Sequence, residues 1–422
     1  MSRLIAAARV LGLFWLLPLQ IVAIVIYRSG TFPVEDGYAP AEQALGAESV
    51  ILCMPLVALA AAIAANKLDR SGFLDRPAGR PPIIATGTPL LGVFLPSAFI
   101  AIAAQVFAFR SVTEFTVSFG LLAIPVAWMG AFALLGWLIG AKLALKLAAP
   151  ISVLIPYALV GFPPALDPPW IQHMVGMSTL CCGVHEVLSW RTVVAALALA
   201  GGMSIALWIA ITRRFARSMA ATVIAGIIVP IGLAGASAAA ASPLGYRATD
   251  LRDAELLTCQ DFGVTVCYWP EHAFEVESAR SEIRAVIESA RANGLYVPKV
   301  MIELPENAVS WPSVPLHISE GDSPSMVQWK ATWSIMPIPS SACQEKMAES
   351  DMGESVTTYA AGGEVLAVWL AESVGNSLPA ELASPDALAL INDLQGDPDD
   401  GAARLRDAQE MILDCRFDRA VL

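Results

Sequence analysis

Long apolar stretches in the first 242 residues are the feature that most constrains what this chain can fold into. A membrane-crossing helix needs roughly 17–25 mostly apolar residues, and seven stretches approach or meet that length. Only 15% of the whole chain is charged, against about 25% in ordinary soluble domains. We therefore predict a membrane protein with an all-α bundle of about seven transmembrane helices. These stretches cover residues 11–27, 48–66, 83–109, 116–140, 143–163, 192–212 and 219–239.

Charge divides the chain into two parts at Ser242. Residues 1–242 contain 14 Lys and Arg against 9 Asp and Glu, a net charge of +5, whereas residues 243–422 contain 12 against 29, a net charge of −17. The second part is long enough for a domain of its own, because domains commonly hold about 100–150 residues. The sequence therefore predicts a transmembrane domain over 1–242 and an acidic α/β domain over 243–422. Neither part has the basic surface that nucleic-acid binding requires.

The distribution of Lys and Arg predicts the orientation, because cytoplasmic loops carry an excess of basic residues. With a cytoplasmic N-terminus, 11 basic residues fall in cytoplasmic segments and three in outer segments. We therefore expect a multi-pass protein of the plasma membrane, in contact with the lipid bilayer, whose acidic domain is extracytoplasmic. A six-span arrangement would reverse that location. The 11 are Arg3, Arg9, Lys67, Arg70, Arg76, Arg80, Lys142, Lys146, Arg213, Arg214 and Arg217; the three are Arg28, Arg110 and Arg191.

We expect a membrane interior without ionisable side chains. Lys142 and Lys146 are placed at the end of a span, and the other polar residues in the stretches are expected to be uncharged, such as Gln20 and Gln105. Ion-coupled transporters usually need an ionisable residue inside the membrane, so this expectation disfavours them. The sequence also lacks a GxxxxGK[ST] phosphate loop, so any ATP-driven transport needs a partner subunit.

Four cysteines of the acidic domain are candidates for disulfides: Cys259, Cys267, Cys343 and Cys415. Disulfides are expected in an oxidising compartment, and four cysteines allow three connectivities. We favour a bond from Cys259 to Cys267, because the short segment between them can form a hairpin. That choice leaves Cys343 to pair with Cys415.

The loop between the fifth and sixth stretches contains His173, Cys181, Cys182 and His185. Histidine and thiolate are ligands of zinc and copper, so a metal site is conceivable here. The spacing matches no finger pattern, however, and Ser189 stands where the HExxH zinc-protease motif needs its second histidine. The alternative is a cap at the membrane interface. We therefore assign no metal ligand and no cofactor, and keep the four residues as a speculative functional loop.

A β-α-β pattern opens the acidic domain, with a strand at 263–269, a helix at 273–292 and a strand at 297–304. Trp269, Glu271 and His272 lie at the first strand–helix junction. Glu271 and His272 could form an acid–base pair, but neighbouring side chains seldom point at one substrate. Glu271 instead suits the positive end of the helix dipole. We therefore predict no catalytic residue, and a protein that is not an enzyme.

Two motifs carry a resemblance to a known group of proteins. Residues 266–272, Val-Cys-Tyr-Trp-Pro-Glu-His, and the His173-x-x-Gly176 loop before Cys181 resemble uncharacterised actinobacterial multi-span membrane proteins described as ABC transporter permease-like. The resemblance implies a permease subunit energised by a separate ABC ATPase, with an outward-facing C-terminal domain.

Three hypotheses about function follow. In the first, the chain is the membrane subunit of an ABC-type transport or immunity system, working as a homo- or heterodimer with a separate ATPase. In the second, the helices only anchor an extracytoplasmic domain that binds or senses a partner. The third, an enzyme of the cell envelope, is the least favoured. A neighbouring gene for an ATPase with the phosphate loop would favour the first.

Overall fold

The computed structural model divides into two compact units, Met1–Arg252 and Asp253–Leu422, called here the helical unit and the C-terminal unit. The division lies beyond Ser242 because a strand at 249–251 still pairs within the helical unit. The structure describes residues 15–29, 37–71, 82–109, 116–176, 181–212, 219–305, 308–309, 312–319, 321–337, 353–375, 391, 393–394 and 398–414.

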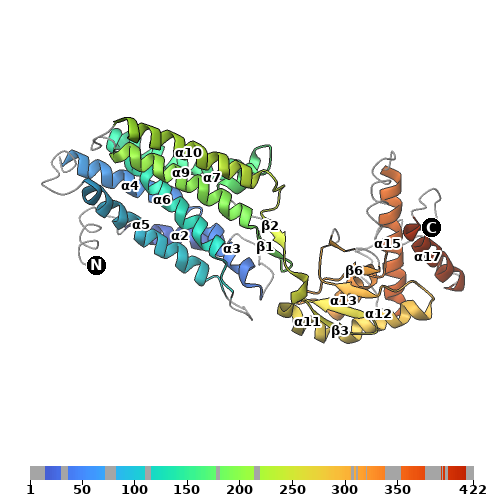
Figure 1. Ribbon diagram of the computed structural model, residues 1–422. Helices are drawn as coiled ribbons and strands as arrows, with labels where there is room; N and C mark the ends of the chain where they lie inside the picture. The colour runs from blue at the N-terminus through green and yellow to red at the C-terminus, as the bar shows by residue number, and fades with distance from the viewer. Residues whose placement is uncertain are drawn as a thin grey trace. The chain divides into compact units, whose positions relative to one another are not determined.

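Apolar helices make up most of the helical unit (Figure 1). In chain order the described helices are α2 (Leu16–Ser29), α3 (Ala39–Ser49), α4 (Cys53–Arg70), α5 (Pro82–Val106), α6 (Phe119–Lys142), α7 (Leu145–Gly161), the short α8 (Ile171–Met174), α9 (Trp190–Thr212) and α10 (Met219–Ala241). Except in α3, which contains Glu42, Gln43 and Glu48, their side chains are apolar nearly all round, as expected for helices that lie in a membrane or in a large core.

Four helical segments in the described residues are long and apolar enough to cross a membrane, so the prediction of seven spans is wrong in number. They are Ala39–Arg70, which joins α3 to α4, Thr86–Val106, Phe119–Lys142 and Trp190–Thr212. Three further apolar helices are shorter, at Leu16–Ser29, Leu145–Gly161 and Gly226–Ala241. At 1.5 Å per residue, the 17 residues of α7 extend about 25 Å, less than the roughly 30 Å of a hydrocarbon core.

The expectation that the spans carry no ionisable residue apart from Lys142 and Lys146 is wrong at Glu48. The second stretch begins at Glu48 itself, and the helical segment extends back to Ala39, so that it includes Glu42 as well. Glu42 is only 6% exposed, and Glu48 Oε2 accepts a hydrogen bond of 3.3 Å from the Tyr27 hydroxyl.

The helices run alternately between two ends of the helical unit. At one end, called the strand end, β1 (Glu186–Leu188) before α9 pairs antiparallel with β2 (Thr249–Leu251) after α10. At the other, called the lysine end, Asn66 near the end of α4 donates to the carbonyls of Gly140 and Leu143 at the end of α6, at 3.2 and 3.0 Å. Helices α9 and α10 thus form a hairpin that returns to the strand end.

Close packing of α4 against α6 forms the centre of the helical unit. Ala58 and Ala62 of α4 are fully buried, and their backbone lies directly against Gly136 and Gly140 of α6. The GxxxG sequence of α6 therefore serves as a close-packing face, since only glycine lets two helix backbones approach so far.

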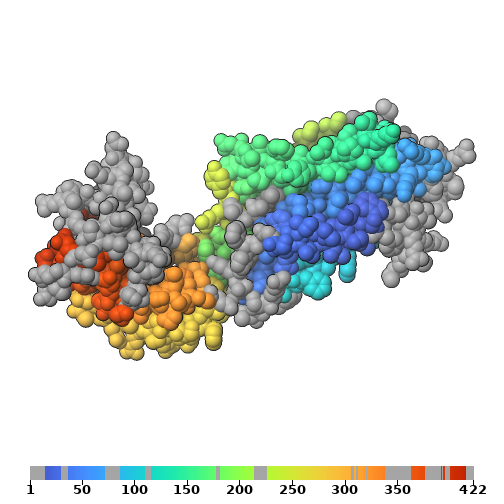
Figure 2. All heavy atoms as spheres, turned by 180° about the vertical axis from the view of Figure 1, so that it is seen from behind, coloured from blue at the N-terminus to red at the C-terminus, as the bar shows by residue number. Residues whose placement is uncertain are grey.

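Apolar side chains also cover the outside of the helical unit. Helix α2, blue in Figure 2, lies at the surface in the view from behind, and its Ile21, Val22, Val25 and Ile26 are all more than half exposed. A large exposed apolar surface of this kind is what contact with lipid requires.

The C-terminal unit contains a four-stranded sheet in the order β3-β4-β5-β6. Its strands are β3 (Thr258–Asp261), β4 (Thr265–Tyr268), β5 (Val300–Ile302) and β6 (Ser313–Pro315). The hairpin pair β3–β4 is antiparallel, whereas β4–β5 and β5–β6 are parallel. The β-α-β unit expected from the sequence is β4, α11 (Ala273–Ser278), α12 (Arg280–Ala292) and β5.

The core of the C-terminal unit lies between this sheet and its helices. Helix α12 contributes Ile283, Val286, Ile287 and Ala290, all fully buried and spaced at helical intervals. The same core includes Val266 and Met301 from the strands and residues of α13 (Pro324–Trp333), α15 (Gly353–Ser373) and α17 (Pro398–Leu413).

Candidate functional sites in the two units

The speculative functional loop folds onto the strand end of the helical unit, where a buried carboxylate organises it. Glu186 accepts a hydrogen bond of 2.9 Å from Arg247 Nη1 at Oε1 and one of 3.2 Å from the Gly183 N–H at Oε2. His185 Nε2 lies 4.0 Å from the same Oε1. The Tyr38 hydroxyl donates to the Glu186 main-chain oxygen at 2.6 Å. The charge of Glu186 is thus paired, as buried charges must be.

His173 of the same loop is buried away from His185. Its Nε2 lies 2.9 Å from the Gly245 carbonyl oxygen, and within the described residues its Nδ1 has no hydrogen-bond partner. Burial lowers the pKa of His173, although the hydrogen bond to Gly245 opposes that shift. The ring is therefore held as a neutral imidazole with its proton on Nε2.

Cys181 and Cys182 of the loop lie in contact through their sulfur atoms. Residues 177–180 before them lie outside the described part of the chain, and the described residues contain no group of three or more His, Cys, Asp or Glu side chains that could hold a metal ion. Gln172 and His173 attach the loop to the chain beyond α10, through the carbonyl oxygens of Tyr246 and Gly245 at 3.2 and 2.9 Å.

A second buried polar network joins α3 to α5 at the strand end. Gln43 Nε2 donates to Gln105 Oε1 at 3.0 Å, and Gln43 Oε1 accepts from the Ser118 N–H at 2.8 Å. In the described residues the Gln105 side-chain amide nitrogen finds no acceptor. Together with Glu42 and Glu48, this network concentrates the buried polar groups of α3 at one end of the unit.

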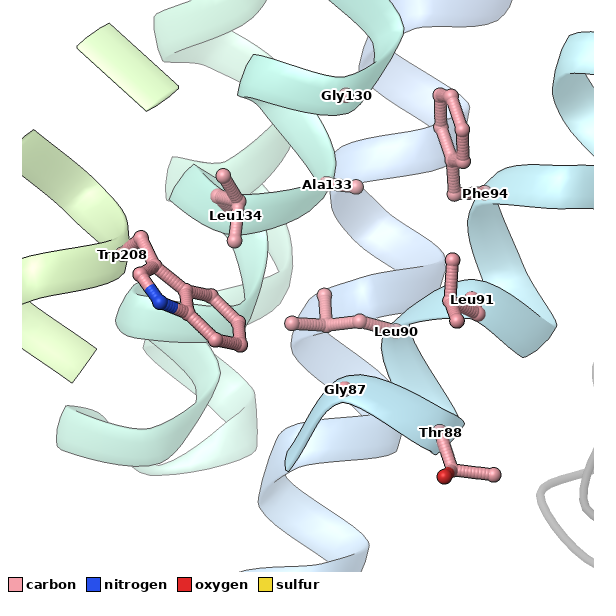
Figure 3. A pocket seen from close by; sticks show the side chains of 9 residues that line it. All are labelled: Gly87, Thr88, Leu90, Leu91, Phe94, Gly130, Ala133, Leu134 and Trp208. Atoms are coloured by element: carbon pink, nitrogen blue, oxygen red, sulfur yellow. The ribbon is translucent and has the colours of Figure 1, made fainter. Parts of the chain in front are cut away.

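An apolar pocket of about 490 Å³ lies between α5, α6 and α9 (Figure 3). Five residues of α5, three of α6 and one of α9 line it: Gly87, Thr88, Leu90, Leu91, Phe94, Gly130, Ala133, Leu134 and Trp208. Only Thr88 and Trp208 among the lining side chains contain a polar atom. The volume falls within the roughly 300–1,000 Å³ of small-molecule sites.

In the C-terminal unit, the ends of three neighbouring parallel strands bring polar side chains together. Trp269 and His272 follow β4, Glu303 follows β5, and His317 follows β6. Because β4, β5 and β6 are parallel and adjacent, their carboxyl ends meet at one edge of the sheet. That edge is where open α/β sheets usually bind ligands. We call these four residues the edge cluster.

Glu303 is the centre of the edge cluster. The carboxylate is 3% exposed; its Oε1 contacts Nδ1 of His272 and lies 3.3 Å from Nδ1 of His317. Its Oε2 accepts the Trp269 N–H at 3.0 Å, and the Trp269 indole donates to the Glu303 carbonyl at 2.9 Å. Four contacts therefore fix both the side chain and the main chain of one buried acid.

These contacts determine the charge of Glu303. Burial raises the pKa of its carboxyl. The hydrogen bonds from His272, His317 and the Trp269 N–H together lower the pKa by more than burial raises it, so the pKa lies below its usual value. The two imidazole rings pack edge to face with centroids 5.8 Å apart. His272 is buried, whereas 42% of the His317 side chain is exposed, so the cluster meets solvent through His317.

Trp269 and His272 lie at the strand–helix junction expected from the sequence, and they make up half of the edge cluster. From the sequence, a Glu271–His272 acid–base pair is disfavoured, and Glu271, which lies in the 3-10 turn Pro270–His272, is expected to cap the helix. His272 contacts Glu303, 31 residues away. Glu303 was missed although it lies within the second predicted strand. His317 was missed because β6 is three residues long and ends in proline.

The hairpin β3–β4 contains the disulfide that the sequence analysis favoured. Cys259 and Cys267 lie opposite each other in the antiparallel register, and their sulfur atoms are 2.02 Å apart. Cys343 and Cys415 lie outside the described residues, so their pairing stays a prediction.

Comparison with known proteins adds no assignment to this geometry. No protein-family model matches the sequence, and no curated protein or solved structure matches it either.

Proposed function

We propose that the chain is a membrane-anchored binding or sensing protein whose C-terminal unit takes up a small polar ligand at the edge cluster. The observation that carries this proposal is the meeting of His272, Glu303 and His317 after three adjacent parallel strands. A buried carboxylate that orients two imidazoles costs free energy to form, and such costs are retained mainly where they serve a site.

The parts of the edge cluster have different roles in this proposal. Glu303 fixes the orientation of both rings through their Nδ1 atoms, so that the Nε2 atoms are the ones directed away from it. Trp269 holds the main chain of Glu303, and His317 is the partly exposed member that a ligand from solvent meets first.

The proposal places the C-terminal unit outside the cytoplasm. The support is the excess of Lys and Arg in segments that meet the lysine end, since basic residues concentrate on the cytoplasmic side. The chain leaves the helical unit after β2, at the opposite end. A binding domain on the outer side would meet solutes of the cell's surroundings.

A thermal-shift screen of the full chain in detergent micelles tests the binding proposal. The probes are amino acids, short peptides, sugars and nucleosides, with His317→Gln as the site variant and His185→Gln, at the strand end, as the matched control. We expect a stabilising compound whose effect disappears in His317→Gln and persists in His185→Gln. A compound whose effect survives both changes binds elsewhere and contradicts the proposal.

A second candidate function is favoured by the apolar pocket. In this proposal the chain is a permease-like subunit of an ABC-type system and the pocket between α5, α6 and α9 receives an apolar substrate. The missing phosphate loop and the resemblance to permease-like proteins support it. Co-purification with an ATPase that carries GxxxxGK[ST], together with ATP hydrolysis only in the complex, is the expected result. Turnover by the chain alone would contradict this candidate.

A further inference from the structure

The apolar pocket lies in the half of the helical unit that faces the lysine end. Helix α5 ends at the strand end, where Gly46 of α3 packs against the backbone of Gln105, so residues 87–94 lie toward its opposite end. Helix α9 begins beside β1, so Trp208 near its C-terminus also lies toward the lysine end. A side chain built from Gly87 would come within 4.0 Å of the Trp208 ring.

The lining of the pocket selects an apolar occupant. Leucine, phenylalanine, alanine and glycine account for all but two of the lining residues. Leu91 is 46% exposed, and Figure 3 shows it beside Leu90 and Phe94 on the α5 wall. The pocket therefore borders the outer surface of α5. Because α5, α6 and α9 each contain a segment long and apolar enough to cross a membrane, we take that surface to face hydrocarbon, where an acyl chain is the abundant apolar molecule.

Basic side chains gather at the lysine end. Lys67 and Arg70 lie in the last turn of α4 and Lys142 in the last turn of α6, with Asp69 as the acidic residue between the first two. In the sequence, Arg213, Arg214 and Arg217 come after α9, and they lie outside the described residues. Basic residues between helices on one side of a membrane bind anionic lipid headgroups.

We propose that the apolar pocket holds one acyl chain of an anionic phospholipid whose phosphate headgroup lies among the basic residues of the lysine end. The pocket selects the chain, and Lys142 with its basic neighbours selects the headgroup charge. The bound lipid fills the space between α5 and α9 and holds the two helices at a fixed separation. This inference does not depend on a ligand at the edge cluster.

Native mass spectrometry of the full chain released from detergent tests the inference, with phosphatidylglycerol and phosphatidylcholine as the two probes. We expect the wild-type chain to retain phosphatidylglycerol in preference. Gly87→Leu places a side chain in the pocket, and retention of both lipids should fall about tenfold, because an occupied cavity does not accept a second apolar group without strain. Gly235→Leu, which adds the same side chain at an open position of α10, should retain lipid as the wild type does.

A headgroup variant tests the second half of the proposal. Lys142→Gln should weaken retention of phosphatidylglycerol about fivefold and leave phosphatidylcholine unchanged, since one basic residue near a membrane surface contributes about 1 kcal/mol.

Gly130→Leu fills the pocket from the α6 wall, and it replaces Gly87→Leu if that variant does not fold. Lipid retention that survives both pocket variants overturns the acyl-chain assignment. Equal retention of the two lipids by the wild type overturns the headgroup assignment, and loss of a dimer rather than of lipid would show that a second copy of the chain fills the pocket.

Discussion

Gly136 of α6 lies so close to Ala58 of α4 that a Cβ atom added to it would overlap the Ala58 main-chain carbonyl. One turn later, Gly140 is related to Ala62 in the same way. The two helices therefore meet backbone to backbone, and this packing requires the small residues at the contact.

The first prediction concerns this contact. Gly136→Ala should lower the thermal unfolding midpoint of the full chain in detergent, because overpacking a close contact typically costs about 1–3 kcal/mol. The matched control is Gly235→Ala, which points into open space on α10. There the change should be neutral or stabilising, since alanine favours a helix over glycine by about 0.5–1 kcal/mol. Effects of the same sign at both positions would contradict the close-packing role.

The second prediction concerns the stability of the C-terminal unit at different pH values. The pKa of Glu303 is lowered in the folded protein, so its carboxylate stabilises the fold at pH values above the unfolded pKa of about 4.3. That stabilisation is lost as the pH falls through the lower, folded value. Glu303→Gln should therefore lower the free energy of unfolding by about 1–3 kcal/mol at pH 7, because the amide leaves buried donors unsatisfied.

Thermal melts between about pH 3 and pH 8 test this prediction, because that range includes the reference pKa of glutamate. The difference between the wild type and Glu303→Gln should be largest at neutral pH and shrink in acid. Glu288→Gln is the control, because Glu288 forms an exposed ion pair with Arg284 and such pairs contribute only about 0.3–0.5 kcal/mol. A difference that does not change with pH would show that Glu303 is not ionised in the folded state.

The sequence predicted the parts of the fold that depend on local patterns. Four of the seven apolar stretches lie in helical segments long and apolar enough to cross a membrane, and the spacing of Ile283, Val286 and Ile287 marks the helix that covers the sheet. Helix limits are less local, because α3 continues into α4 through the turn at 50–52 and so brings Glu42 into the same segment as the stretch that begins at Glu48. The apolar pattern did not show this continuation, since residues 39–47 resemble a surface loop in composition.

The edge cluster shows the same limit at the candidate site. Trp269 and His272 stand next to a recognisable strand, whereas Glu303 and His317 gain meaning only when the parallel order β4-β5-β6 is known. Parallel register depends on contacts between residues far apart in the chain, and no short motif encodes it. Glu303 also lay inside the expected strand 297–304, whereas β5 ends at Ile302, so the strand boundary itself hid the residue.

The third prediction concerns the hairpin disulfide. Cys259 and Cys267 are bonded across β3 and β4, so Cys259→Ser should release one thiol, at Cys267. Peptide mapping after thiol labelling of the unreduced, denatured chain should then find Cys53, which is free in the structure, and Cys267. The lost bond should lower stability by about 2–4 kcal/mol, mainly through the unfolded chain. A label on Cys259 and Cys267 in the unreduced wild type would contradict the bond.

The last prediction concerns the side of the membrane on which the C-terminal unit lies. Helices α9 and α10 form a hairpin whose two free ends are paired through β1 and β2, so residues just before α9 and just after β2 belong to the same side. Alkaline phosphatase fused after Arg252, which keeps β2 intact, should be active, because the basic residues of the lysine end favour the cytoplasm. The same reporter fused after Ser71, beyond Lys67 and Arg70 at the end of α4, should be silent, and a cytoplasm-dependent reporter should give the reverse pattern at both sites.

Activity of the phosphatase at Ser71 and silence at Arg252 would place the C-terminal unit in the cytoplasm. A reducing compartment would then surround the bond between Cys259 and Cys267, and the binding proposal would have to be rebuilt around cytoplasmic ligands.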